Sequence, residues 1–185
     1  MRVIAGTRRS LPLRTIDSDE TRPTADRYKE TLFNVIQADI PDAKFLDLFA
    51  GSGAIGIEAL SRGARHATFV ENGRKQLEVI KANIHFTKFE NESDIMRGDA
   101  ISYLRGLSKV DFDVIFIDPP YHHGLQQEAL MVLNNKQFRN SDALIIVEAA
   151  ADEDMDFISS TKFEITKIKE YKTNRHIFMR IKAEK

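Results

Sequence analysis

Residues 112–121, with the sequence FDVIFIDPPY, decide the fold, because a buried strand runs directly into a rigid polar turn. The first six residues are rich in Val, Ile and Phe, which is typical of a buried strand. Two prolines then end the strand, since neither has an N–H to donate to a neighbouring strand. Ligands bind at the carboxyl edge of open α/β sheets. The stretch therefore predicts that Asp118 and Tyr121 lie at the rim of an active site.

The chemistry of this turn suits a flat ring that carries an amino group. Asp118 and the Pro119 carbonyl can accept hydrogen bonds from N–H groups, and the Tyr121 ring can stack on the face of the ring. An ordinary strand exit, with a solvated acid and a packed tyrosine, is the alternative interpretation. A second motif upstream decides between the two.

Residues 47–56, DLFAGSGAIG, fit the pattern G-x-G-x-x-G between a predicted strand at 44–49 and a predicted helix at 54–62. Small residues in such a turn let a ligand approach the backbone closely. The next predicted strand, 66–71, ends at Glu71, which is placed to accept hydrogen bonds from ribose hydroxyls. Together these features predict a nucleotide-like cofactor.

Dinucleotide and S-adenosylmethionine sites share this layout, so the glycines alone do not separate them. Asp47 lies four residues before Gly51. A carboxylate there is unfavourable beside a pyrophosphate, but it can meet the cationic amino end of S-adenosylmethionine, directly or through water. The Asp-Pro-Pro-Tyr turn also suits methyl transfer to an amino group. S-adenosylmethionine is therefore the better fit.

Four motifs together carry a family resemblance: TRPT at 21–24, DLFAGSG at 47–53, EALSRGA at 58–64 and DPPY at 118–121. In this combination the chain resembles the bacterial 16S ribosomal RNA guanine-N2 methyltransferase family, from about residue 2 to residue 171. The DPPY motif alone is shared by amino-methylating enzymes that act on DNA and RNA. Two positions depart from the family pattern: Ile55 stands where Leu is common, and no glycine follows Tyr171.

The resemblance implies an α/β fold of the class I S-adenosylmethionine-dependent methyltransferase (Rossmann-like) type. Its sheet has seven mostly parallel strands with one antiparallel strand, and an N-terminal β-hairpin and helix precede it. The implied reaction is methylation of the exocyclic N2 amine of a guanine in 16S ribosomal RNA. The implied cofactor is S-adenosyl-L-methionine, and the implied partner is an assembled or nearly assembled small ribosomal subunit. We expect one domain, residues 1–185, with an extension at 1–40 and a Rossmann-like core at 41–185.

Hydrophobic patterns give the same architecture independently, because predicted strands and helices alternate as in a doubly wound sheet. The expected N-terminal hairpin pairs residues 2–5 with 11–15, and Thr24 is expected to cap a helix over 25–38. The core strands are expected near 44–49, 66–71, 94–97, 112–117 and 143–148, and the helices near 54–62, 74–86, 100–107 and 124–134. A final hairpin pairs 163–171 with 176–181.

The residues and the resemblance together predict the site. The predicted catalytic residues are Asp118, Pro119 and Tyr121; the cofactor-binding residues are Asp47, Gly51, Gly53, Glu71, Asp99, Ile101 and Asp118; and the RNA-binding residues are Arg8, Arg9, Arg22, Thr24 and Tyr121. The resemblance assigns Asp99 to the adenine amine, although an N-cap for the helix starting near residue 100 is an equally good interpretation. Ile101 is placed to pack on adenine, but an apolar helix residue is more often part of the core.

Composition limits the chemistry. The 185-residue chain contains no cysteine, so disulfides, thiolate metal sites and methylation through a cysteine adduct are excluded. We expect no metal, since His122 and His123 are adjacent and lack a partner at ligand spacing. With neither a signal-peptide pattern nor an apolar run of membrane-spanning length, the protein is expected in the cytoplasm, without a membrane partner.

The net charge of −1 conceals a pattern. Residues 1–14 contain four arginines and no acid, and residues 162–185 contain eight basic residues against three glutamates. Basic segments at both ends of a chain can contact phosphates. For this reason Arg8 and Arg9 are predicted to contact RNA.

Three other functions remain open from the sequence. The first is an amino methyltransferase that acts on adenine N6 of DNA or RNA, or on a protein glutamine; the short chain disfavours a DNA enzyme with its own recognition domain. The second is a nicotinamide-dependent oxidoreductase that uses the same glycine loop, which Asp47 and the DPPY turn disfavour. The third is a catalytically silent RNA-binding module.

Overall fold

The computed structural model describes residues 1–16 and 22–183, with the side chains of residues 22–25 outside that description. The sheet contains β1 (Lys44–Leu48), β2 (His66–Glu71), β3 (Ser93–Arg97), β4 (Val114–Ile117), β5 (Leu144–Ala150), β6 (Phe163–Glu170) and β7 (Asn174–Ile181). The order is β3-β2-β1-β4-β5-β7-β6, and β7 runs antiparallel to both of its neighbours. This confirms the expected seven-stranded sheet with one antiparallel strand.

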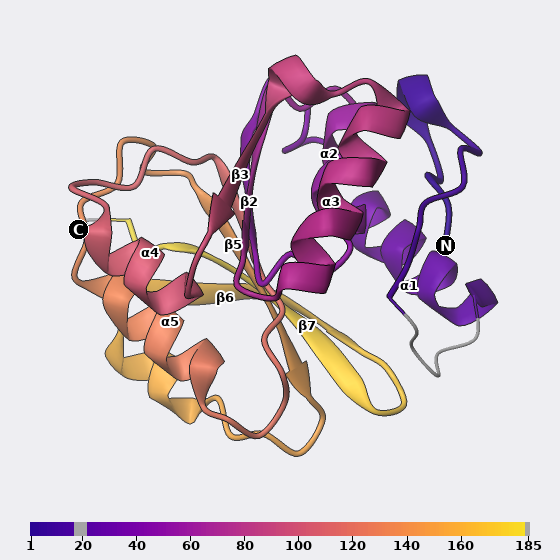
Figure 1. The fold of residues 1–185 in the computed structure, drawn as a ribbon. Helices are drawn as coiled ribbons and strands as arrows, with labels where there is room; N and C mark the ends of the chain where they lie inside the picture. Colours follow the sequence, from indigo (N-terminus) through magenta and orange to yellow (C-terminus); the bar gives the residue numbers. More distant parts are fainter. Residues whose placement is uncertain (17–21, 184–185) are drawn as a thin grey trace.

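Helices cover both faces of the sheet (Figure 1). The α-helices are α1 (Arg22–Val35), α2 (Ala54–Ser61), α3 (Arg74–Thr87), α4 (Ala100–Gly106) and α5 (Leu125–Asn134), and the short 3-10 helices are η1 (Gly6–Arg8), η2 (Glu90–Glu92) and η3 (Asp156–Ser160). One buried cluster joins α1, α2 and α3 to one face of the sheet, and a second joins α4 and α5 to the other face.

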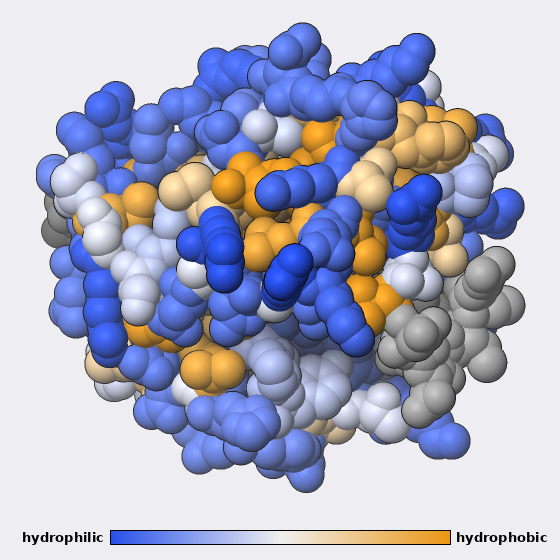
Figure 2. Space-filling view, viewed as in Figure 1, coloured by the Kyte–Doolittle hydropathy of each residue, from blue (hydrophilic) through white to orange (hydrophobic). Residues whose placement is uncertain are grey.

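Alternation along the strands explains the two clusters. Phe45 and Phe116 belong to the cluster under α1–α3, whereas their neighbours Leu46 and Ile117 belong to the cluster under α4 and α5. Successive strand residues point to opposite faces, so a strand covered on both sides is apolar throughout. On the face shown in Figure 2, hydrophobic residues lie across the middle of the view and are interrupted by hydrophilic side chains.

The expected N-terminal hairpin is wrong in detail. Two segments do run antiparallel, with Val3 N donating to Leu11 O at 2.9 Å, but only one isolated bridge, between Arg2 and Pro12, is formed. Pro12 has no N–H for a ladder. The backbone N–H groups of Ile4 and Ala5 donate to the Glu58 carboxylate and not to a partner strand.

Glu58 of α2 anchors this extension to the core. It is fully buried and accepts from Lys29 Nζ at 3.2 Å and from Arg62 Nε at 2.7 Å, besides the two backbone groups. Buried charges are tolerated when they are paired and hydrogen-bonded in this way. Burial lowers the pKa of Lys29, although the Glu58 charge opposes that effect. The 58–64 motif thus has a structural role in attaching the N-terminal segment.

Several element boundaries also differ from expectation, most clearly the start of the first helix and the start of the last strand. Helix α1 begins at Arg22, so Thr24 lies inside the helix and not at its N-cap. Proline is well accommodated in a first helical turn, where its missing N–H is not needed, and Pro23 occupies that turn. At the C-terminal end, β7 begins at Asn174, two residues earlier than expected, and shortens the final turn.

Candidate active site

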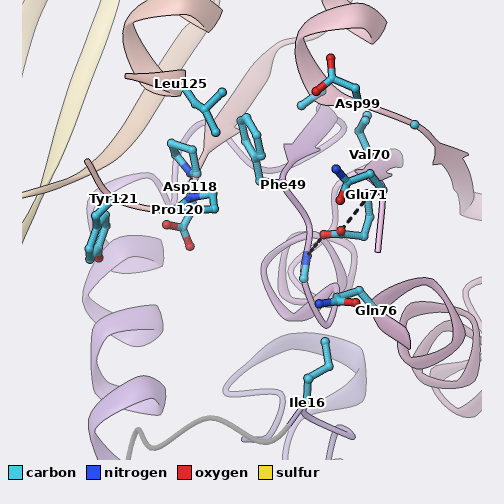
Figure 3. A pocket seen from close by; sticks show the side chains of 15 residues that line it. Ile16, Phe49, Val70, Glu71, Gln76, Asp99, Asp118, Pro120, Tyr121 and Leu125 are labelled. Atoms are coloured by element: carbon cyan, nitrogen blue, oxygen red, sulfur yellow. Dashed lines mark hydrogen bonds between the residues drawn. The ribbon is translucent and has the colours of Figure 1, made fainter. Parts of the chain in front are cut away.

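A pocket of about 600 Å³ lies at the carboxyl edge of the sheet, near the ends of β1, β2 and β4. Strand order reverses between β1 and β4, and such a switch point is where open α/β sheets bind ligands. Figure 3 shows Asp118, Pro120 and Tyr121 on one side of the pocket, Glu71 and Asp99 on the other, and Phe49 between them. Of the predicted site residues, the lining contains Gly51, Glu71, Asp99, Asp118, Pro119 and Tyr121.

The glycine turn after β1 closes this edge. Gly51 and Gly53 have φ values of 56° and 75°, a region where a side chain is strained. Gly51 N donates to Glu71 Oε2 at 2.9 Å, which joins the turn to the end of β2. Gly56 has a packing role, because a Cβ there would lie 2.3 Å from the Phe69 ring. The pattern therefore serves both ligand approach and close contact between helix and strand.

Phe49 was not predicted as a site residue. It lines the pocket with a φ of 68°, in the left-handed region that bulky residues rarely adopt. Residues held in this way occur at functional sites, where the surrounding structure maintains the strain. Nothing in the periodicity of the sequence indicates this conformation.

Asp47 and Gly53 lie behind the lining. Asp47 is 2% exposed, and its Oδ2 accepts from Gly56 N at 2.9 Å. Burial raises the pKa of Asp47 to about 7, with a smaller contribution from the Glu71 charge, and the Gly56 hydrogen bond opposes both. Gly53 is the buried N-cap of α2. Both residues support the turn from beneath.

Glu71 and Asp99 form the end of the pocket that faces β2 and α4. Glu71 Oε1 accepts from the backbone N of Asn72 and Gly73, at 2.9 and 2.8 Å. Asp99 Oδ1 accepts from Ser102 N at 2.7 Å, so Asp99 caps α4 and also lines the pocket. That hydrogen bond lowers the pKa of Asp99.

Ile101 does not line the pocket. It is 3% exposed and belongs to the cluster beneath α4 and α5. Ala100, one residue earlier, lines the pocket in its place. The interpretation of Ile101 as a core residue is therefore the one that the geometry favours.

Glu153, an acid that follows β5, holds the backbone of the turn after β4. Glu153 Oε1 accepts from His122 N and from Gln126 Nε2, each at 2.8 Å. Its Oε2 accepts from Ala150 N at 2.8 Å. This bracing fixes the backbone that carries Asp118, Pro119 and Tyr121.

Tyr121 is linked to residues that the sequence did not indicate. Its hydroxyl donates to Glu148 Oε1 at 2.6 Å, and the same oxygen accepts from Asn174 Nδ2 at 2.6 Å. His176 Nε2 lies 2.9 Å from Glu148 Oε2, and Tyr171 Oη lies 3.2 Å from His176 Nδ1. The cluster joins the turn after β4 to β5 and β7.

Glu148 is ionised in this cluster. Burial alone would raise its pKa, but the hydrogen bond and charge of His176, with bonds from Tyr121 and Asn174, outweigh burial and lower it. Burial and the Glu148 carboxylate raise the pKa of Tyr121, so its hydroxyl stays protonated. Glu148 and His176 line a smaller cavity of about 210 Å³, which Asp118 also lines. Glu148 lies near the end of a predicted strand, and the same reasoning that identified Glu71 would have found it.

The charge of the larger pocket is one-sided. Its lining contains the three carboxyl groups of Glu71, Asp99 and Asp118 and no Lys, Arg or His among the described residues. A pyrophosphate would be repelled by such a lining, and a ligand that carries positive charge would be attracted.

Arg8 and Arg9 are distant from this edge. Arg8 Nε donates to Thr87 O at 2.7 Å, at the C-terminal end of α3, and its guanidinium lies over the Phe89 ring. Its backbone N donates to Ser61 at the end of α2. Helices that follow parallel strands end at the edge of the sheet opposite the pocket, so Arg8 lies at that opposite edge. Its contacts there join the N-terminal segment to the ends of α2 and α3. Arg9 is exposed on the same loop.

Arg22 and Thr24 belong to the first turn of α1, and their side chains lie outside the described residues.

Within residues 1–16 and 22–183, no group of three or more His, Cys, Asp and Glu side chains is arranged to hold a metal ion. In the same part of the chain, none of the helices has the length and apolar character of a membrane span.

Comparison with known proteins places this architecture among methyltransferases. Residues 1–180 match the family described as conserved hypothetical protein 95. The ribosomal RNA small subunit methyltransferase D of Haemophilus influenzae is 38% identical, over 82% of this chain and 80% of its own length. The protein of the same name from Escherichia coli K12 is also 38% identical, over 82% and 76%.

A solved structure, "Putative methyltransferase yhhF from Escherichia coli", superposes with a TM-score of 0.85. It is 31% identical in sequence, and the superposition covers 100% of this chain and 99% of that one. The Rossmann-like class I methyltransferase fold expected from the sequence is thereby confirmed. The chain belongs to the conserved hypothetical protein 95 family, and its relatives include proteins named as methyltransferases of small-subunit ribosomal RNA.

Proposed function

We propose that this protein transfers a methyl group from S-adenosylmethionine to the exocyclic N2 amine of a guanine in small-subunit (16S) ribosomal RNA. Its membership of the family supports the methyltransferase class and the cofactor, and the names of its relatives support ribosomal RNA as the substrate. The choice of guanine N2 is a finer proposal, supported by the chemistry of the turn after β4.

The observation that carries the proposal is the one-sided charge of the pocket. Glu71, Asp99 and Asp118 line it, and no cationic side chain among the described residues does. S-adenosylmethionine carries a positive sulfonium and a positive ammonium group, which suit this lining. A nicotinamide dinucleotide carries a negatively charged pyrophosphate, so the lining disfavours the oxidoreductase alternative.

The proposed cofactor contacts follow the two ends of the pocket. Glu71 would accept from the ribose hydroxyls and Asp99 from the adenine amine, while Gly51 lets the ligand approach the backbone. Asp47 and Gly53 would act from beneath, through the glycine turn or through water. When bound, S-adenosylmethionine supplies an electrophilic methyl group whose transfer discharges the sulfonium, so no metal is required.

The turn after β4 would hold the acceptor. A guanine amine is a poor nucleophile because its lone pair is delocalised into the ring. Asp118 and the Pro119 carbonyl would accept its two hydrogens, which localises the lone pair, and the Tyr121 ring would stack on the base. Asp118 would then take the proton lost after transfer. Holding the two reactants in line contributes up to about 7–11 kcal/mol in well-oriented reactions.

The RNA surface is proposed at the edge that carries the pocket. The turn between β6 and β7 lies at the carboxyl end of β5, because Asn174 pairs with Ala150, and exposed Lys172 belongs to that turn. Arg22 and Thr24 of α1 remain proposed RNA contacts. Arg9 lies at the edge opposite the pocket, so it would contact RNA only if the substrate particle is large enough to extend around the protein. An assembled small subunit is such a particle, and residues 1–185 would act on it as one domain.

The experiment is a labelling reaction with tritiated S-adenosylmethionine. Small subunits lacking the modification, free 16S RNA and DNA are incubated separately with the protein, and the labelled nucleoside is identified after digestion. We expect N2-methylguanosine from the small subunits. Label found only in N6-methyladenosine, or only in DNA, would contradict the substrate assignment.

A further inference from the structure

Glu148 has no role in the proposed reaction, yet it lies at the acceptor end of the site. Its carboxylate lines the smaller cavity together with Asp118, and the Tyr121 hydroxyl is bonded to it at 2.6 Å. Its side chain is 17% exposed, so it is accessible to a ligand in the cavity without being freely solvated. A ring stacked on Tyr121 would therefore have carboxylates near it from both β4 and β5.

The Glu148 carboxylate is held in a fixed orientation. Tyr121 and Asn174 donate to Oε1, and His176 lies 2.9 Å from Oε2. His176 is itself 2% exposed and in contact with Tyr171. A carboxylate offers about four lone-pair positions. Three of them are matched by these neighbours, which leaves room for one further donor.

The bases differ in what they place beside the amino group. Guanine has the N1–H donor next to its N2 amine, so two neighbouring positions of its Watson–Crick edge are donors. Adenine and cytosine each place a ring-nitrogen lone pair next to the amino group. A carboxylate accepts from an N–H but repels a lone pair, and enzymes that act on an exposed base read this edge by hydrogen bonds.

We propose that Glu148 determines specificity for guanine by accepting the N1–H of the base whose N2 amine is held by Asp118. The proposal rests on the proposed function and deepens it. Glu148 selects the base, and His176 and Asn174 position its carboxylate. Bases that have no ring N–H beside the amino group, such as adenine, are rejected by the same oxygen.

The test compares guanine with 2,6-diaminopurine, which keeps the amino group at position 2, replaces N1–H by a lone pair and carries an amino group in place of O6. Small subunits are reconstituted with either base at the position that the wild-type protein methylates, and kcat/KM is measured for both. A site built around a hydrogen bond rejects an analogue that lacks it strongly. We expect the wild-type protein to prefer guanine by about 100-fold or more.

The informative variant is Glu148→Gln, whose amide has the same size and can donate to the ring lone pair. We expect kcat/KM for guanine to fall about 10- to 100-fold and the preference over diaminopurine to shrink below about tenfold. Glu148→Asp keeps the charge, so the preference for guanine should persist at a lower rate. Glu164→Gln on β6, an exposed glutamate, is the matched control and should leave both rates unchanged.

The outcomes separate the two proposals. If the wild-type protein labels no guanine N2, the proposed function fails. If it labels guanine N2 but Glu148→Gln, while still binding S-adenosylhomocysteine, keeps the wild-type preference, only the role of Glu148 is overturned. If Glu148→Gln does not bind S-adenosylhomocysteine, the test uses Glu148→Asp. This variant keeps the negative charge, so loss of its preference for guanine over diaminopurine would contradict the proposal.

Discussion

The two ends of the site are built from different kinds of contact. At the end near β2, Glu71 is bonded to the backbone of Gly51, Asn72 and Gly73, all within the turns that follow β1 and β2. At the end near β4 and β5, Glu148 is bonded to side chains 26 to 28 residues away in the chain. The first end is built from backbone N–H groups of two turns, whereas the second is built from side chains, two of them on the antiparallel strand β7.

This difference has a functional consequence. The end near β2 would hold the methyl donor, so changes there should weaken cofactor binding more than they slow the reaction. The end near β4 and β5 would hold the acceptor, so changes there should slow methylation and leave cofactor affinity nearly intact. Substitutions at four positions test this division, beginning with the largest expected effect.

Asp118→Ala should reduce the methylation rate about 1,000-fold or more, since removing a single stabilising group typically costs 10²–10³-fold and Asp118 is proposed both to orient the amine and to take its proton. The dissociation constant of S-adenosylhomocysteine should change by less than about tenfold. Both are measured on the same preparation, by tritium transfer and by calorimetry. Asp111→Ala, which removes a half-exposed acid far from the pocket, is the control. Wild-type turnover in Asp118→Ala would refute its catalytic role.

Asp47→Asn tests whether Asp47 is buried under the glycine turn as a protonated acid, through the pH dependence of the free energy of unfolding. Burial raises the pKa of Asp47 to about 7, against an ordinary value near 3.9 in the unfolded chain. Between about pH 4 and 7 the unfolded chain has released this proton while the folded protein keeps it, so stability falls as pH rises through that window. The asparagine variant lacks the proton and should not show this loss.

The difference should reach at most about 4 kcal/mol above pH 7, from three pKa units at about 1.4 kcal/mol each. Urea unfolding followed by circular dichroism measures it, which suits a chain without tryptophan. Parallel stability curves for the wild type and Asp47→Asn across pH 4 to 8 would show that Asp47 is not buried as an acid.

The same division explains what the sequence could predict. The glycine turn, Glu71 and the DPPY turn are short patterns whose meaning depends on residues next to them, so the sheet and residues on both sides of the pocket were predictable. Phe49 and His176 were not, because a left-handed φ and a partner on β7 come from tertiary packing. For Ile101 both adenine contact and a core position were open, because helix position alone does not reveal which side faces the core.

Glu71→Ala should weaken binding of S-adenosylmethionine by about 10- to 100-fold, since hydrogen bonds to a charged group contribute about 1.5–3 kcal/mol. At saturating cofactor the turnover number should stay within a few-fold of wild type. A steady-state series in S-adenosylmethionine separates the two constants, with the exposed Glu78→Ala on α3 as the control. A fall in turnover with unchanged cofactor affinity would contradict the proposal that Glu71 binds the cofactor.

Asp99 gives the smallest and most discriminating effect, because it caps α4 and also lines the pocket. Asparagine caps a helix about as well as aspartate, whereas alanine costs about 0.5–2 kcal/mol. Asp99→Asn should therefore keep wild-type stability and Asp99→Ala should lose it. If Asp99 also accepts from the adenine amine, both variants should bind S-adenosylhomocysteine about 3- to 10-fold more weakly. Their affinity for the purine riboside analogue, which carries only hydrogen at position 6, should equal that of the wild type, because the lost interaction then has no partner. Equal effects on both ligands would leave the cap as the sole role of Asp99.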